Sequence, residues 1–104
     1  MRAAATTLLM TLAAAAAAGA GPRVHVIVVE NMRFNPEQIT VARGDRIQWV
    51  NRDLFPHTAT ASGGAFDSHQ IAVQGTWTYV AARSGEYDYT CVLHPTMKGR
   101  IHVR

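Results

Sequence analysis

The most constraining feature of this chain is a period-two alternation of apolar and polar residues, which recurs in short segments after residue 21. Alternation of this kind places every second side chain on one face of a β-strand. No stretch after residue 21 has a convincing helical period, and Gly, Pro, Asn and Asp separate the alternating segments. The pattern therefore predicts an all-β domain. The expected strands are 24–30, 38–42, 46–51, 58–61, 76–81, 86–92 and 100–104.

About seven short strands with turns at this spacing are typical of a β-sandwich. Without its first twenty residues, the 104-residue chain is long enough for one small domain with one core. Phe34 and Phe66 are expected to close the ends of that core. The other core candidates are Ile39, Val41, Trp49, Val50, Val80, Tyr87 and Ile101.

The first twenty residues have the composition of a secretory leader. Arg2 supplies a positive start, an apolar run covers 3–18, and Ala18-Gly19-Ala20 offers the small-x-small pattern of a cleavage site. We therefore expect a signal peptide at 1–20, a mature domain at 21–104 and a periplasmic location. An uncleaved membrane anchor is the alternative, although the run barely reaches the roughly 20 strongly apolar residues that a spanning helix needs. No membrane span is expected in the mature form.

The charge pattern argues against one class of partner. The formal net charge is +3, and the basic residues are scattered among Asp and Glu instead of forming a run or patch. We therefore do not expect the chain to bind nucleic acid.

Residues that can donate sulfur or nitrogen to a metal accompany Cys91, which is the only cysteine in the sequence. An unpaired thiol is unusual in an exported protein, and binding a metal would protect it. His94 and Met97 follow Cys91 at steps of three, and His57 lies upstream. One thiolate, two imidazoles and one thioether are the donors of a blue-copper electron-transfer site, where Met is the weak axial ligand. Pro95 and Gly99 are expected to help the segment after Cys91 curl around an ion, and Pro95 also keeps it from continuing as a regular strand.

Other interpretations exist for the same residues. The three-residue steps would also fit one face of a helix, but Pro95 and Gly99 oppose a helix there. Taken singly, each histidine could be an ordinary surface residue, and Met97 could be packing. Zinc is the rival ion, yet a thioether is a poor zinc ligand and structural zinc sites usually contain more than one cysteine. Three further histidines, His25, His69 and His102, stay outside the predicted set.

The segments 55–58 (FPHT) and 87–99 (YDYTCVLHPTMKG) resemble the cupredoxins, the small type I copper proteins. Within that family they are most similar to the amicyanin and plastocyanin group, and the two-residue gaps between Cys, His and Met match the amicyanins. The resemblance implies a Greek-key β-sandwich and single-electron shuttling between redox partner proteins. It also implies one type I copper ion, held by His57, Cys91, His94 and Met97.

The resemblance further implies that His94 is the ligand that reaches the surface. It suggests that the amide of Asn51 ties the His57 loop to the Cys91 strand, although Asn51 could instead be a simple turn residue. An electron carrier needs a dry docking patch beside its exposed ligand, and the interface with an electron donor or acceptor is expected to be small and transient. We expect that patch to contain Phe55, Leu93 and Pro95, flanked by Leu54 and Pro56; the alternative is that Leu54 and Phe55 pack inward. The expected oligomeric state is a monomer.

Three functions can be compared from these residues. The leading one is an exported electron carrier that cycles between Cu(I) and Cu(II). The alternative is a periplasmic copper chaperone or copper-storage protein with the same ligands. An oxidase or nitrite-reductase type of enzyme would need further copper centres and histidines to build them, so we expect no enzymatic activity from this chain alone.

Overall fold

The computed structural model describes residues 3–9 and 21–104 of the chain. Residues 3–9 are exposed and belong to no strand. Among the described residues there is no helix long and apolar enough to cross a membrane. Residues 21–104 contain eight β-strands. These strands are β1 (Val24–Glu30), β2 (Arg33–Asn35), β3 (Gln38–Val41), β4 (Arg46–Asn51), β5 (Thr60–Ala61), β6 (Thr76–Val80), β7 (Gly85–Cys91) and β8 (His94–Val103).

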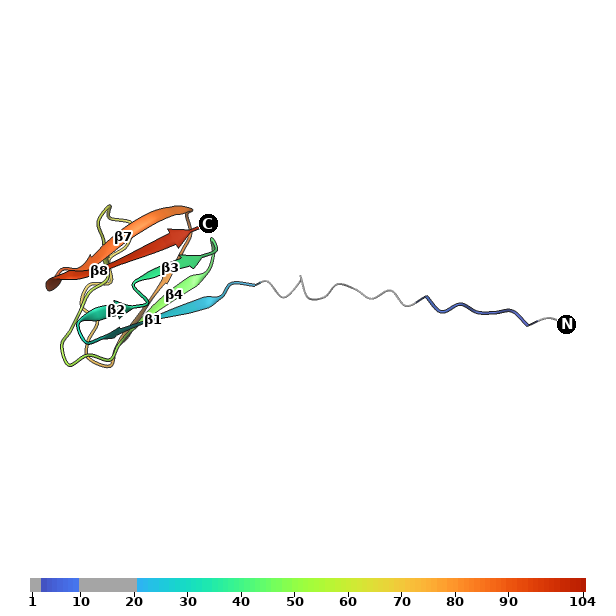
Figure 1. Cartoon of the computed structure of the whole chain (residues 1–104), viewed down its shortest axis with the longest axis horizontal. Coiled ribbons are helices and arrows are strands. Elements are labelled where there is room, and N and C mark those ends of the chain that lie inside the picture. The colour runs from blue at the N-terminus through green and yellow to red at the C-terminus, as the bar shows by residue number, and fades with distance from the viewer. Residues whose placement is uncertain (1–2, 10–20) are drawn as a thin grey trace.

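The strands form two four-stranded sheets that face each other as a sandwich (Figure 1). The first sheet has the order β2-β1-β4-β6 and the second has the order β3-β8-β7-β5. Two pairs are parallel, β1 with β4 and β3 with β8, and the other neighbours are antiparallel. The turn between β7 and β8 lies at the end of the sandwich away from the C-terminus (Figure 1). β1 runs toward that same end, so β4, which is parallel to it, also ends there.

The space between the sheets is filled by the inward-facing residues of each strand and by an aromatic cluster. β1 buries Ile27 and Val29, and β4 buries Trp49 at its centre. The Trp49 ring lies 5.5 Å from that of Tyr89 on the opposite sheet, in an edge-on arrangement at 88°. Phe66 packs against both rings, at 5.6 and 5.9 Å. Edge-on and tilted aromatic pairs of this kind stabilise a core beyond the area that they bury, so the cluster helps to hold the two sheets together.

The all-β prediction is confirmed, but two strand predictions are wrong. β2 lies between the expected strands 24–30 and 38–42, where no strand was expected; its Phe34 pairs with Val29 and is buried against the core. β8 begins at His94 instead of residue 100, because the chain turns back directly after Cys91 and pairs His94 with it. Pro95 led to the expectation of a longer loop, whereas the local hairpin resumes extended backbone before it.

Most of the predicted core residues are buried or pack against the core, and Val80 is the clear exception. Its side chain is 46% exposed. On β6 the half-buried residues are Trp77 and Tyr79, which pack against the core, so alternation turns Val80 toward solvent. Val50 is half-buried for the same reason on β4. The residues confirmed in or against the core are Phe34, Ile39, Val41, Trp49, Phe66, Tyr87 and Ile101.

The predicted signal peptide lies mostly outside the described residues. Residues 1–2 and 10–20, which include the predicted cleavage site Ala18-Gly19-Ala20, are not among them. The division into a leader at 1–20 and a mature domain at 21–104 therefore stays a prediction.

Candidate metal centre

The hairpin that joins β7 to β8 brings Cys91 and His94 together. Cys91 is the last residue of β7, His94 is the first of β8, and the two are paired across the turn. The preceding pair is Thr90 with Lys98, so the register shifts between Thr90 and Cys91. Residues 95–97 therefore have no partner on β7 and bulge out of the ladder. This bulge is the curled segment that the spacing of the donors requires.

His57 reaches the same place from the segment between β4 and β5. Its backbone N–H donates to the Ile71 carbonyl at 3.2 Å, and its own carbonyl accepts from the Ile71 N–H at 2.7 Å. The His57 side chain is fully buried. These two backbone hydrogen bonds hold the residue as firmly as a strand would, although it lies in a connecting segment.

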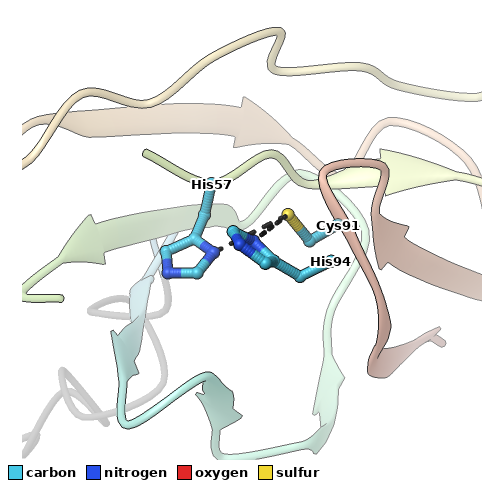
Figure 2. A group of neighbouring side chains, drawn as sticks. All are labelled: His57, Cys91 and His94. Carbon is cyan, nitrogen blue, oxygen red and sulfur yellow. Dashed lines mark hydrogen bonds between the residues drawn. The ribbon is translucent and has the colours of Figure 1, made fainter. Parts of the chain in front are cut away.

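The two imidazoles and the thiol converge on one point (Figure 2). The Cys91 Sγ lies 3.7 Å from the His57 Nδ1 and 3.7 Å from the His94 Nδ1. The three donor atoms lie within 4.8 Å of one another. In the described part of the chain, no other group of three or more His, Cys, Asp or Glu donors comes this close together. The fold therefore brings together three predicted ligands, His57, Cys91 and His94, that are separated in the sequence.

Met97 lies in the bulge between the two paired positions of β8. Its side chain is buried, and it belongs to the same core cluster as Cys91. The thioether is thus inside the protein at the metal-facing hairpin. Its role as the fourth, axial donor stays a prediction.

Thr58 joins the two chain segments that supply the ligands. Its backbone N–H donates to the Cys91 Sγ at 3.2 Å, which supports negative charge on the sulfur. Its hydroxyl oxygen accepts from the Val92 N–H at 2.9 Å. Sequence reasoning missed this residue, since a threonine after a histidine in a strand-like segment carries no signal of its own.

Asp53 was also missed, and it contacts a predicted ligand directly. Its carboxylate lies 2.8 Å from the His57 Nε2 and accepts the Met32 N–H at 3.0 Å. Burial acts to raise the pKa of Asp53, but the hydrogen bonds from Met32 and His57 outweigh burial and lower the pKa below its ordinary value of 3.8. The carboxylate is therefore ionised at neutral pH.

Asn51 holds the His57 loop, but not in the way that was expected. Its side-chain amide donates to the carbonyls of Phe55 and Ile71, at 2.8 and 3.0 Å. Its side-chain oxygen accepts from the Asp53 N–H at 2.9 Å. The expectation that Asn51 ties the loop to the Cys91 strand is wrong, because Asn51 at the end of β4 lies beside Ile71 instead. Thr58 connects the loop to the Cys91 strand.

His94 is half-buried while His57 and Cys91 are fully buried, and exposed apolar residues of the β7–β8 hairpin and of the segment that contains Phe55 form an apolar rim beside it. The Phe55 ring stands 6.3 Å from the His94 ring, edge-on. The alternative in which Leu54 and Phe55 pack inward is wrong, because the two residues are 82% and 53% exposed. The exposed members of this apolar rim are Leu54, Phe55, Val92, Leu93 and Pro95.

The three remaining histidines lie away from the centre, each beside an acidic residue. His25 contacts Asp45 at 2.8 Å and His102 contacts Glu86 at 2.6 Å. The His69 side chain is 86% exposed and stands 3.7 Å from Asp67. None of the three belongs to a group of metal-binding size among the described residues.

The comparison with protein families agrees with this geometry. A sequence model of the cupredoxin-like domain matches residues 2–103. The chain belongs to the cupredoxin-like family. The amicyanin of Paracoccus versutus is 28% identical over 83 residues, which are 75% of this cupredoxin and 63% of the relative. A plastocyanin of Synechococcus sp. is 28% identical over 85 residues, which are 67% of this chain and 62% of the relative. The cupredoxin described here thus spans less than two thirds of the length of these relatives.

Solved structures confirm the sandwich as a cupredoxin fold. The copper(I) form of an amicyanin variant is 25% identical and superposes with a TM-score of 0.75, over 85% of this chain and 89% of the other. A purple cupredoxin from Nitrosopumilus maritimus is 21% identical, with a TM-score of 0.71 over 77% and 99% of the two chains. The second likeness is one of fold alone. The predicted similarity to the amicyanin and plastocyanin group is confirmed.

The residues present fit a copper ion of the type I class. The set combines one sulfur with two Nδ1 atoms, the sulfur and the His57 ring are buried, and the sulfur accepts a hydrogen bond from the Thr58 N–H. Two imidazoles and one cysteine are the in-plane ligands of blue-copper sites, and a methionine is the usual axial one. His57, Cys91, His94 and Met97 form a possible ligand site for that ion.

Proposed function

We propose that this cupredoxin is an electron-transfer protein that carries single electrons between redox partners through one copper ion held by His57, Cys91, His94 and Met97. The convergence of the Cys91 Sγ and two Nδ1 atoms within 4.8 Å is the observation that carries the proposal. A copper ion bound there would supply a one-electron Cu(I)/Cu(II) couple.

The chain's own contribution is to hold the donors still. His57 is fixed by two backbone hydrogen bonds to Ile71, and Cys91 by the hydrogen bond from Thr58. Donors that are held in this way do not have to rearrange when the charge of the centre changes, so little reorganisation opposes transfer. Soft sulfur and neutral imidazole together suit both oxidation states.

The exposure of the ligands favours one exit for the electron. Electron tunnelling falls steeply with distance, so a partner gains most by docking against the ligand nearest the surface, His94. The apolar rim beside it can lose water when a partner docks, and redox encounters use small interfaces of this kind. We therefore propose that both donor and acceptor dock transiently at the apolar rim.

The location and the domain division form a second part of the proposal. We propose that residues 1–20 are a secretory signal peptide and that the mature domain, 21–104, works in the periplasm. The composition of the first twenty residues and the single cysteine support it. We also infer that the chain catalyses no reaction by itself, since the described residues hold one compact set of metal donors and an oxidase type of enzyme would need further copper centres.

The experiment that tests the function begins with titration of the copper-free protein with Cu(II), followed by visible and electron paramagnetic resonance spectra. We expect an intense visible band from copper–thiolate bonding, its loss in Cys91→Ser, and an altered spectrum in His94→Asn. The matched control is His102→Asn, which removes a histidine far from the centre and leaves the spectrum unchanged. A colourless copper complex of the unmodified protein would contradict the proposal.

The rival role, copper delivery or storage, is separated by a second measurement. A carrier retains its metal through repeated cycles of chemical reduction and oxidation, whereas a chaperone gives Cu(I) readily to a competing chelator. The burial of His57, Cys91 and Met97 favours retention. Rapid loss of Cu(I) to the chelator without redox turnover would favour delivery instead.

A further inference from the structure

We infer that Asp53 is a positioning residue of the metal centre: its carboxylate fixes the tautomer and the orientation of His57 and so presents the Nδ1 lone pair toward the Cys91 sulfur. The inference rests on the proposed role of His57 as a ligand. Its test is arranged so that either idea can fail without the other.

The two ring nitrogens of His57 have different partners, and these partners determine which nitrogen carries the proton. A neutral imidazole has one N–H and one lone pair, and a carboxylate only accepts. The Asp53 Oδ2 lies 2.8 Å from the His57 Nε2, so Nε2 is the nitrogen that donates. The lone pair is then on Nδ1, the atom that stands 3.7 Å from the Cys91 Sγ. With the proton on the other nitrogen, the carboxylate would face a lone pair and Nδ1 could not bind a metal.

Asp53 is itself held through both its carboxylate and its backbone. The Met32 N–H donates to the same Oδ2 at 3.0 Å. Asn31 and Met32 form the two-residue turn between β1 and β2, and both have positive φ, 54° and 58°, as a tight hairpin requires. The Asp53 N–H in turn donates to the Asn51 Oδ1 at 2.9 Å. Asp53 thus anchors the ligand ring to the tip of one hairpin and the end of β4.

The contact between His57 and Asp53 is largely shielded from water, and Asp53 brings a negative charge to it. The His57 side chain is completely inaccessible and that of Asp53 is only 13% exposed, so water does not replace the carboxylate easily. A carboxylate behind a metal-bound histidine makes the imidazole a better donor, and removing such a partner typically lowers metal affinity by about 10–100-fold. Its negative charge also favours the more positive oxidation state of the metal, so it lowers the reduction potential.

The test compares Asp53→Ala and Asp53→Asn with a matched pair, Glu86→Ala and Glu86→Gln. Glu86 makes the same kind of contact with His102, at 2.6 Å, as an exposed residue at the end of β7 opposite to Cys91. The first readout uses the copper-free protein: ¹⁵N shifts of the His57 ring should show protonated Nε2 and bare Nδ1. We expect a tautomer mixture in Asp53→Ala and recovery of the single tautomer in Asp53→Asn, whose amide oxygen can still accept both hydrogen bonds.

The second readout uses the copper-loaded protein. Asp53→Ala should bind Cu(II) about 10–100-fold more weakly, and Asp53→Asn should have a higher reduction potential than the unmodified protein because the charge is lost. Both Glu86 variants should match the unmodified protein. If Asp53→Ala does not fold, Asp53→Asn alone decides through its affinity and potential.

The possible failures are distinct. An unchanged His57 tautomer in a folded Asp53→Ala, or an unchanged affinity and potential in Asp53→Asn, would overturn the role of Asp53. A protein that shows the fixed tautomer but forms no blue copper complex would leave Asp53 as the orienting residue and overturn the proposed function instead.

Discussion

Thr58 shows how much one ordinary residue can do at this centre. Its backbone contacts the Cys91 sulfur while its side chain contacts the Val92 backbone, so it attaches the His57 segment to the β7–β8 hairpin at two points. One attachment is at the Cys91 sulfur and the other is at the backbone of the next residue, Val92. The separation between the ligand segments is therefore set by Thr58 as well as by the metal.

The side-chain half of this attachment can be tested by Thr58→Val, which keeps the shape of the residue and its N–H. The Val92 N–H loses its acceptor, and an unpaired, partly buried donor costs about 1–3 kcal/mol. We expect this loss in urea denaturation, with the blue colour retained because the bond to sulfur is unaffected. Thr78→Val on the exposed face of β6 is the control and should change stability by less than about 0.5 kcal/mol. Equal stabilities of the two variants would contradict the role of Thr58.

At the residue scale, the ligands could be predicted and their supports could not. Cys91, His57, His94 and Met97 belong to residue types with specific metal chemistry, and their spacing restricts the ion. Asp53 and Thr58 are common loop residues whose roles depend on partners 4 to 34 positions away. Asn51 illustrates the limit, since its importance was expected but its hydrogen-bond partners were not. Only the folded chain determines which carbonyl an amide meets.

Among the structural elements, the β7–β8 hairpin depends on a close cross-strand contact. Gly99 on β8 lies opposite Tyr89 on β7, and the Tyr89 ring occupies the space where a side chain at Gly99 would begin. A Cβ there would collide with the ring. The glycine was expected to help the metal loop curl, whereas its structural role is to make room for a buried aromatic side chain.

We therefore expect Gly99→Ala to destabilise the protein by about 1–3 kcal/mol, because overpacking displaces a fully buried ring. The measurement is the midpoint of urea denaturation. Gly63→Ala is the control: no atom lies near its added Cβ, and its φ is not positive. Such a change should be neutral or should stabilise by up to about 1 kcal/mol. A Gly99→Ala midpoint equal to that of Gly63→Ala would refute the packing argument.

Strands were predictable from alternation where one face is buried, as in β1 and β4. The prediction failed where the size of neighbouring side chains or the conformation of a turn determines the structure. Val80 alternates correctly but belongs to the outward set, because the larger Trp77 and Tyr79 occupy the inward positions of β6. β2 is only three residues long, and its pairing with β1 depends on a turn in which both Asn31 and Met32 have positive φ, a conformation that is uncommon for methionine.

At the scale of the whole molecule, a buried carboxylate ties the start of β1 to the turn before β4, at the end far from the metal centre. Asp45 accepts hydrogen bonds from the Arg23 N–H and the Ala42 N–H, and it contacts His25. The hydrogen bond from Arg23, followed by that from His25, lowers the pKa of Asp45 to about 2 from its ordinary value of 3.8. A lowered pKa in the folded state means that the unfolded chain binds more protons as the pH falls.

The stability that Asp45 contributes should therefore be complete above about pH 4 and disappear as the pH falls toward 2. We expect Asp45→Asn to have a lower Tm than the unmodified protein at pH 7, with the gap closing between pH 4 and pH 2. Copper-free protein should be used, so that metal loss at low pH does not contribute. A gap that is independent of pH would show that the charge of Asp45 has no part in it.

The apolar rim leads to a prediction about encounters with other proteins. Leu93→Glu places a charge in the proposed docking surface, and desolvating it costs more than the about 1.4 kcal/mol that corresponds to a factor of ten. We expect bimolecular electron transfer with a redox protein to slow by at least about tenfold while the visible spectrum stays the same. Val80→Glu is the control, because Val80 is similarly exposed but lies on the other sheet. Equal slowing by both variants would place docking elsewhere.

The position of β8 in the sequence, where it is the strand that pairs with both β3 and β7, has a consequence for the synthesis of the protein. β8 is the latest strand in sequence, it completes the second sheet, and it contains both His94 and Met97. A nascent chain that lacks this strand has an unfinished sheet and half of the proposed donors. Metal therefore cannot template early folding here, as zinc does in a zinc finger. A copper ion can meet all four proposed donors only after β8 has been synthesised.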